Sequence, residues 1–287
     1  MPDTAAVGAP LEMQAVQDLI DTIQIPPRPD LLCNLQKEME KDDPNLRAMS
    51  RMIAKDAALC GALLKSANSA FARLPRKAET VEEAITGLGL QLVSMLVAGF
   101  LLRGAFPDSP EFTAFWDTSA KQASAASHIA KALHYDSGET AHVFGLFCDI
   151  GMPLMAKRFT DYTETLRLAG QAAEISFTRF EEQRHQTSHT VAGALLARNW
   201  MLPRDVIMAI RLHHDPSVFK LTQASAEVRH LIALEIIADL IIEEYRARQP
   251  STELQAMRPA AMQELGLSAG ELNDLSVEIH SLFEQEE

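Results

Sequence analysis

The chain has 287 residues, and 39 acidic side chains outnumber 26 lysines and arginines, which gives a formal net charge of −13. This acidic balance argues against a general affinity for nucleic-acid backbones or membrane surfaces, because both require a positive protein surface. Hydrophobic residues make up 47% of the chain and charged residues 23%, which is typical of globular rather than disordered proteins. The length predicts one or two domains.

Three cysteines, Cys33, Cys60 and Cys148, occur without a CxxC pair. They do not form a disulfide framework and they fit a reducing compartment, so we expect a cytoplasmic protein. The first basic residue is Arg28, so we expect no signal peptide. The most apolar run, 90–102, is shorter than the roughly 20 residues of a membrane-spanning helix, and we interpret it as a buried core helix.

Helix-favouring residues are abundant and alternating β-branched runs are lacking, so the sequence predicts an all-α fold. An N-terminal tail, 1–19, precedes the first solid segment. The break at Pro107 and Pro110 predicts a boundary between two lobes, 20–106 and 107–217. In the first lobe, apolar residues recur on one face of a helix that includes Leu59, and we expect Cys60 beside it to be core.

The second lobe is predicted to contain longer helices. We expect them near 112–134, 140–147, 150–169, 189–200, 203–213 and 227–246. The segment 218–250 completes this lobe, and its Glu235 and Asp239 are four residues apart, so they share one face of a helix.

The C-terminal tail, 251–287, contains eight acidic residues and one basic residue, Arg258. Ser268 and Glu271 have capping-box spacing and precede apolar residues at helical intervals, so we expect an acidic amphipathic helix that docks on the body or on a partner. Residues 266–270 also fit the G-x-S-x-G elbow of hydrolases. That elbow needs a preceding strand and downstream acid and histidine partners, so we interpret Ser268 as a helix cap instead.

Several polar residues of the second lobe are candidate metal ligands, because imidazole and carboxylate groups on different helices can converge on one ion. Asp149 and the histidines can equally be hydrogen-bonded core or capping residues. His185 and His189 do not form an HExxH motif, which excludes that metalloprotease mechanism. On a regular helix, His213 and His214 would point about 100° apart, so we expect that the two cannot bind the same metal ion together.

The order and spacing of several short motifs resemble an HDOD domain over about 20–217. The motifs are IPPRP (25–29), DAAL (56–59), LKSANS (64–69), AITGLG (84–89), FW (115–116), GLFCDIG (145–151), the stretch 189–203 and HHDP (213–216). The resemblance implies two helical lobes, the second related to HD phosphohydrolases. It also implies an output or interaction domain of bacterial signalling proteins rather than an enzyme.

An HD phosphohydrolase holds its metal with a histidine, a His-Asp pair and a later aspartate. The resemblance places these ligands at Thr118, Cys148-Asp149 and Asp239, so both histidines are absent. Cys148 could ligate zinc as a thiolate, whereas Thr118 is a poor ligand. Three histidines resemble the additional ligands of HD-GYP phosphodiesterases: His189, His213 and His214.

Two functions follow as hypotheses. The first is a non-catalytic bacterial regulatory protein that binds a signalling protein or a small signalling ligand, has no resident cofactor and can form a homodimer. The second is a metal-dependent phosphohydrolase with an altered site for Fe, Mn, Zn or Ni. A nucleotide-binding sensor without turnover is a third option. The candidate cleft is the same in each: Thr118, Cys148, Asp149, His189, His213, His214 and Asp239.

Overall fold

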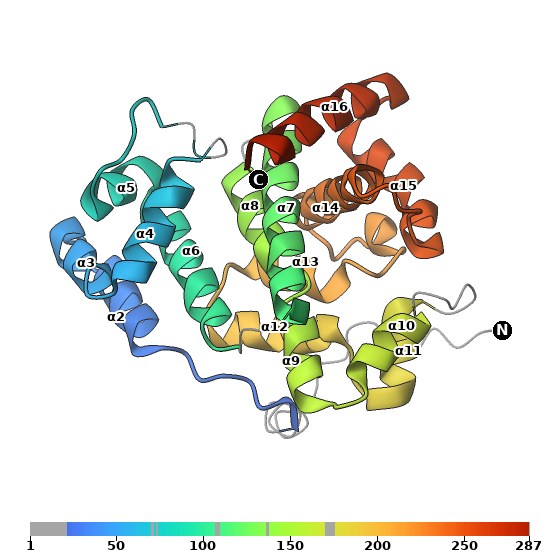
Figure 1. The fold of residues 1–287 in the computed structure, drawn as a ribbon, viewed down its shortest axis with the longest axis horizontal. Helices are drawn as coiled ribbons and strands as arrows, with labels where there is room; N and C mark the ends of the chain where they lie inside the picture. Colours follow the sequence, from blue (N-terminus) through green and yellow to red (C-terminus); the bar gives the residue numbers. More distant parts are fainter. Residues whose placement is uncertain are drawn as a thin grey trace.

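The computed structural model describes residues 22–286 except 70, 71, 73, 107–109, 136, 137 and 170–175. Every regular element in these residues is a helix, which confirms the all-α prediction. The helices form a smaller N-terminal lobe, at the left of Figure 1, and a larger C-terminal lobe at the right. The predicted tail, 1–19, and Pro107 lie outside the described residues.

The N-terminal lobe consists of α2 (Asp30–Met39), α3 (Leu46–Ile53), α4 (Ala57–Ala67), α5 (Val81–Leu88) and α6 (Leu90–Arg103). Side-chain oxygens of Asn45, Asp56 and Thr80 cap α3, α4 and α5, which explains where these helices begin. Leu59 is buried as predicted, whereas Cys60 is only half-buried at the edge of the core. The apolar run predicted as a core helix is α6, whose side chains are mostly buried.

The C-terminal lobe is built on the long helices α7 (Pro110–Ala132) and α14 (Ala226–Tyr245). Shorter elements surround them: α8 (Gly138–Phe147), α9 (Gly151–Arg158), α10 (Tyr162–Ala169), α11 (Phe177–His185), α12 (His189–Asn199), α13 (Arg204–Leu212) and the 3-10 helix η1 (Val218–Lys220). The predicted single helix at 150–169 is wrong, because Phe159 leaves the helical region at φ −116° and ψ 112° and ends α9. Its ring packs on His185, with centroids 4.5 Å apart, a long-range contact that sequence periodicity cannot show.

Two glycines bring α8 and α9 unusually close to their neighbours. A Cβ atom on Gly145 would lie 2.6 Å from the backbone nitrogen of Ala123 in α7. A Cβ atom on Gly151 would lie 1.8 Å from the carbonyl oxygen of His189, at the start of α12. Asp149 lies between these glycines in the sequence, so the two close approaches bring it next to His189 and α7.

The acidic C-terminal residues form α15 (Thr252–Leu265) and α16 (Ala269–Glu286), which pack on the body of the lobe. Figure 1 shows them, in orange and red, beside α14 and α7. Their apolar side chains, among them Met257, Leu265, Ile279 and Phe283, belong to the core. The capping box is confirmed, because the Ser268 hydroxyl and the Glu271 carboxylate exchange hydrogen bonds with each other's backbone N–H groups.

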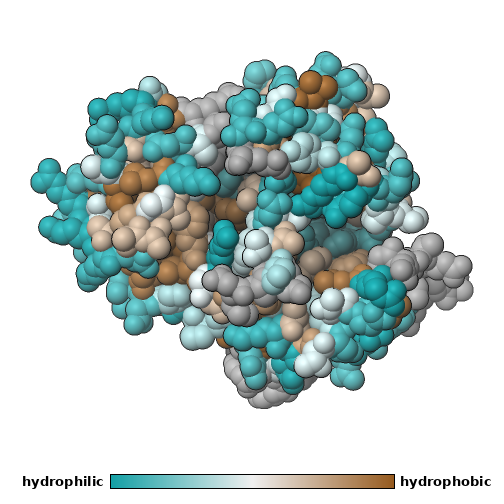
Figure 2. Space-filling view, in the orientation of Figure 1, coloured by the Kyte–Doolittle hydropathy of each residue, from teal (hydrophilic) through white to brown (hydrophobic). Residues whose placement is uncertain are grey.

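An extended segment before α2 connects the lobes from outside. The indole N–H of Trp200, at the end of α12, donates a hydrogen bond of 3.1 Å to the carbonyl oxygen of Pro26. Helix α6 also packs directly against α8. Figure 2 shows hydrophilic side chains over most of the face in view, with apolar ones gathered over the N-terminal lobe.

Within the described part of the chain, no single helix is both long and apolar enough to cross a membrane. Helices α5 and α6 reach the required length only as a pair, and the chain bends by 120° between them.

Candidate metal centre

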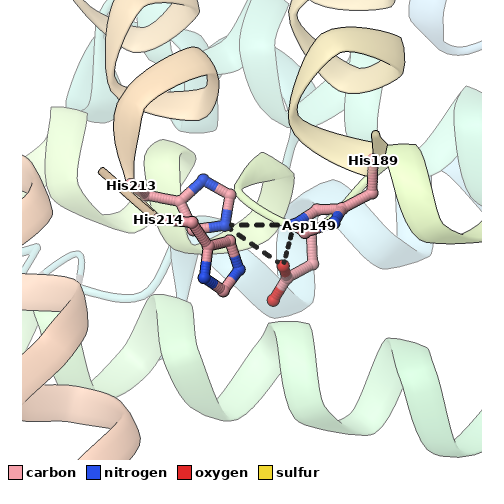
Figure 3. A group of neighbouring side chains, drawn as sticks. All are labelled: Asp149, His189, His213 and His214. Carbon is pink, nitrogen blue, oxygen red and sulfur yellow. Dashed lines mark hydrogen bonds and ion pairs between the residues drawn. The ribbon is translucent and has the colours of Figure 1, made fainter. Parts of the chain in front are cut away.

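Asp149, His189, His213 and His214 form a compact cluster in the C-terminal lobe (Figure 3). One ligand atom from each residue can be chosen so that all four lie within 4.8 Å of one another. Asp149 Oδ1 lies 3.5 Å from His189 Nε2 and 3.4 Å from His213 Nε2. We call these four residues the histidine cluster.

Each member of the histidine cluster lies at a helix boundary. Asp149 is in the turn between α8 and α9, and His189 is the first residue of α12. His213 and His214 directly follow Leu212, the last residue of α13. The prediction that both cannot ligate one metal assumed a regular helix through both residues, and this condition does not hold, because α13 ends before them. Their ring centroids are 4.3 Å apart.

A second layer of acceptors holds the Nδ1 atom of every histidine. His189 Nδ1 lies 2.7 Å from Glu181 Oε2, His213 Nδ1 lies 2.9 Å from the Ile210 carbonyl oxygen, and His214 Nδ1 lies 2.7 Å from Glu253 Oε1. In a neutral imidazole, an acceptor at Nδ1 places the single proton there and leaves the Nε2 lone pair available for a metal. The cluster therefore has the hydrogen-bonding pattern that orients ligating histidines.

Glu181, one of these acceptors, is fully buried, with no exposed side-chain surface. Burial raises the pKa of its carboxyl group. The charge and hydrogen bonds of His189, together with the hydrogen bond from the Tyr162 hydroxyl, lower that pKa by more, so the net pKa is below its usual value. An ionised Glu181 also accepts the backbone N–H of His189 at 3.1 Å. One carboxylate thus fixes both the ring and the backbone at the start of α12.

The charges within the histidine cluster favour an ionised Asp149. Burial raises the pKa of this carboxyl group, but the hydrogen bond from His213 and the nearby histidine charges lower it well below its ordinary range. The pKa of His213 is lowered by burial and raised more strongly by Asp149, so its net shift is upward. Burial and the neighbouring His213 charge lower the pKa of His214. A metal at this site would therefore displace a proton from His213.

The other carboxylate oxygen of Asp149 faces a different group of residues. The amide of Gln122, on α7, donates hydrogen bonds of 3.1 Å to Asp149 Oδ2 and 3.0 Å to Asp239 Oδ1. Cys148 Sγ lies 3.6 Å from Asp149 Oδ2. Burial and the adjacent carboxylates raise the pKa of the Cys148 thiol well above its usual value, so the metal-free protein holds it as a neutral thiol.

Glu235, which is buried, and Asp239, which is half-buried, form an acidic pair on α14. Burial raises the pKa of Glu235 well above its usual value and that of Asp239 to about 6, and a hydrogen bond joins the two side chains. Asp239 therefore faces Gln122 and Glu235, and it is not a member of the histidine cluster.

Thr118 lies one helical turn before Gln122 on α7 and has other partners. Its hydroxyl donates to the Ala114 carbonyl oxygen at 3.0 Å and accepts a hydrogen bond of 2.9 Å from Arg246. Sequence reasoning missed Gln122, Glu181 and Glu253. Of these three, only Gln122 could have been found from the sequence. It follows Thr118 by four residues and therefore lies on the same face of the helix.

The donor set fits a divalent transition metal. Three imidazole nitrogens and one carboxylate oxygen suit Zn, Fe, Mn or Ni, and each imidazole has its outer nitrogen occupied. The structure thus brings together four of the seven predicted cleft residues, with Cys148 and Asp239 next to Asp149 and Thr118 apart from it.

The profile of the HDOD domain family matches residues 25–216, so this chain belongs to the HDOD family. The fold is similar to that of an HDOD domain protein with unknown function from Geobacter sulfurreducens, with a TM-score of 0.65, 21% identity and coverage of 93% of this chain and 95% of that one. A protein named "Putative phosphohydrolase" from Shewanella amazonensis is also similar, with a TM-score of 0.68, 20% identity and coverage of 92% and 93%.

A curated relative is an uncharacterized protein from Treponema pallidum (strain Nichols) that is 26% identical over 237 residues. The match covers 79% of this chain but only 44% of that relative.

Proposed function

We propose that the protein is a non-catalytic signalling or regulatory protein that holds one divalent transition-metal ion in the histidine cluster and binds a partner protein or a small signalling ligand. The observation that carries this proposal is the occupied Nδ1 atom of each histidine, which leaves three Nε2 atoms and the Asp149 carboxylate for a metal. The overall charge of −13 favours a partner other than nucleic acid.

The number of ligands supports binding without turnover. Structural zinc sites use four protein ligands, whereas catalytic zinc sites use three and keep one position for water or substrate. The histidine cluster offers four. On the other side of Asp149, the resemblance to HD phosphohydrolases would require further ligands at Thr118 and Asp239. The Thr118 hydroxyl instead accepts a hydrogen bond from Arg246, and Asp239 accepts one from the Gln122 amide.

Metal analysis tests this proposal. We expect wild-type protein to bind about one equivalent of Zn²⁺, Fe²⁺, Mn²⁺ or Ni²⁺, and Asp149→Ala to bind none, because its carboxylate contacts two of the three histidines. Metal at 100 times its dissociation constant should add about 2.7 kcal/mol to the free energy of unfolding. Asp117→Ala, which removes an exposed carboxylate of α7, is the control and should bind like wild type. Wild-type protein that takes up no metal would contradict the proposal.

A metal-dependent phosphohydrolase is the second candidate, because the similar Shewanella amazonensis protein carries the name "Putative phosphohydrolase". A bound ion would polarise a phosphoryl oxygen and activate water. Metal-loaded protein should be assayed with bis(p-nitrophenyl) phosphate and with cyclic dinucleotides. Turnover that requires metal and is lost in Asp149→Ala would favour this candidate, whereas full metal occupancy without turnover would favour the first.

A further inference from the structure

Glu253 belongs to the C-terminal helices, beyond the residues 25–216 that define the family match. It lies in the first turn of α15, which the Ser251 hydroxyl caps by accepting the Leu254 N–H at 3.1 Å. Its side chain is 20% exposed, and that of His214 is 24% exposed. The contact between them is therefore largely shielded from water.

The two oxygens of Glu253 join three segments. Oε1 lies 2.7 Å from His214 Nδ1, directly after α13, and Oε2 accepts the backbone N–H of Phe177, at the start of α11, at 2.9 Å. The Phe177 ring stacks on His214, with centroids 5.5 Å apart and planes at 26°, and its centroid lies 5.3 Å from that of His189. The His214 ring is thus held at one edge by Glu253 and on one face by Phe177.

We infer that Glu253 is a positioning residue for the histidine cluster, and that α15 thereby completes the metal centre. This inference rests on the proposed metal site. The hydrogen bond fixes the proton of neutral His214 on Nδ1, so Nε2 remains unprotonated and turned toward Asp149 and the other histidines. His189 and His213 obtain the same support from within the family-matched segment, through Glu181 and Ile210. His214 alone depends on the C-terminal helices.

A purely structural role predicts a different result. In that case Glu253 would only hold α15 against α11 through the Phe177 N–H, and its loss would lower stability without changing the His214 ring. Glu264 provides a matched control for such a role. It lies on the same helix, its side chain is 17% exposed, and it pairs with Arg229 at 2.9 Å, away from the cluster.

The experiment compares wild type with Glu253→Ala, Glu253→Gln and Glu264→Gln in the full-length chain. The first measurement uses chelator-treated, ¹⁵N-histidine-labelled protein, in which long-range ¹H–¹⁵N correlations identify the His214 tautomer. The second is Zn²⁺ affinity by competition with a chromophoric chelator, and circular dichroism establishes that each variant is folded. We expect the Nδ1–H tautomer in wild type and in Glu264→Gln, and a mixture of tautomers in Glu253→Ala.

Zn²⁺ affinity should fall by about 10- to 100-fold in Glu253→Ala, the usual cost of losing such a partner. Glu253→Gln keeps an acceptor oxygen and should lose less, and it replaces Glu253→Ala if that variant does not fold. An unchanged tautomer in both Glu253 variants would overturn the inference, as would unchanged affinity in a metal-binding wild type. If wild type binds no Zn²⁺ or other metal, the proposed function fails, and the tautomer of metal-free His214 still decides the role of Glu253.

Discussion

Asp149 presents its two carboxylate oxygens to chemically different surroundings. Oδ1 faces the imidazoles of His189 and His213, whereas Oδ2 accepts from the Gln122 amide. The same amide also binds Asp239. At the scale of single residues, the two aspartates of the candidate cleft are therefore divided: Asp149 lies with the histidines, whereas Asp239 is hydrogen-bonded to Gln122 and Glu235.

The acidic pair predicts a pH dependence of stability. Burial raises the pKa of Asp239 from 3.8 to about 6, so between these pH values the folded protein binds more protons than the unfolded chain. The free energy of unfolding should consequently fall as pH rises through this window. The Asp239→Asn variant should show a smaller fall. Above pH 7, its free energy of unfolding should exceed that of wild type by up to about 3 kcal/mol.

Urea denaturation with chelator present, at several pH values from 4 to 8, measures this effect. Asp274→Asn, at an exposed position of α16, is the control and should parallel wild type. If Asp239→Asn also parallels wild type across the range, burial does not control the protonation of Asp239.

The sequence predicted the members of the histidine cluster better than the residues that contact them. Asp149, His189, His213 and His214 stand out because histidine and aspartate are uncommon in apolar helical surroundings. Glu181 and Glu253 do not stand out, since glutamate is abundant on helix surfaces and no local spacing relates either residue to a histidine. Their roles depend on contacts between different helices, with Glu181 8 residues and Glu253 39 residues away from the histidine that each contacts.

At the scale of helices, the presence of a helix was easier to predict than the residue at which it ends. Helix α4 follows from its periodic apolar residues, and α16 follows from its capping box. The end of α13 at Leu212 lies within one residue of the predicted end at 213, but that prediction did not show that His213 and His214 face one site. Phe159, which ends α9, contacts His185 on α11. Local spacing thus predicts the helices, whereas the contacts between helices that shape the site are visible only in the structure.

The contact of α9 with α12 yields a prediction about packing. Gly151→Ala should destabilise the protein by at least about 1–3 kcal/mol, because its Cβ would lie 1.8 Å from the His189 carbonyl oxygen and the helices must move apart. Such a shift should also weaken metal binding. Chemical denaturation and the chelator competition assay measure the two effects.

Gly61→Ala is the matched control, because a Cβ atom at Gly61 in α4 meets nothing within 4 Å. This substitution should be neutral or stabilising by up to about 1 kcal/mol. Equal effects of the two substitutions would show that the close approach at Gly151 is not what holds α9 against α12.

At the scale of the whole molecule, the acidic C-terminal residues are part of the C-terminal lobe. The net charge of the chain is concentrated there, and sequence analysis left open whether these residues dock on the body or on a partner. In the structure their apolar face is buried against α14 and α7 while their acidic residues are largely at the surface. A segment outside the family match thus contributes both to the core and, through Glu253, to the histidine cluster.

Removal of residues 251–287 should therefore abolish stable folding of the C-terminal lobe rather than merely release a partner. Burial of one large apolar side chain contributes about 1.5–3 kcal/mol, and several are lost together, against a total stability of about 5–15 kcal/mol for a typical protein. Phe283→Ala, at a side chain only 1% exposed, is a smaller perturbation of the same packing and should lower the free energy of unfolding by about 3–5 kcal/mol. Val277→Ser, at a side chain 62% exposed on the same helix, should cost little. Thermal unfolding followed by circular dichroism distinguishes these outcomes, and a truncated chain that unfolds cooperatively at the wild-type temperature would show that the two helices are dispensable for the fold.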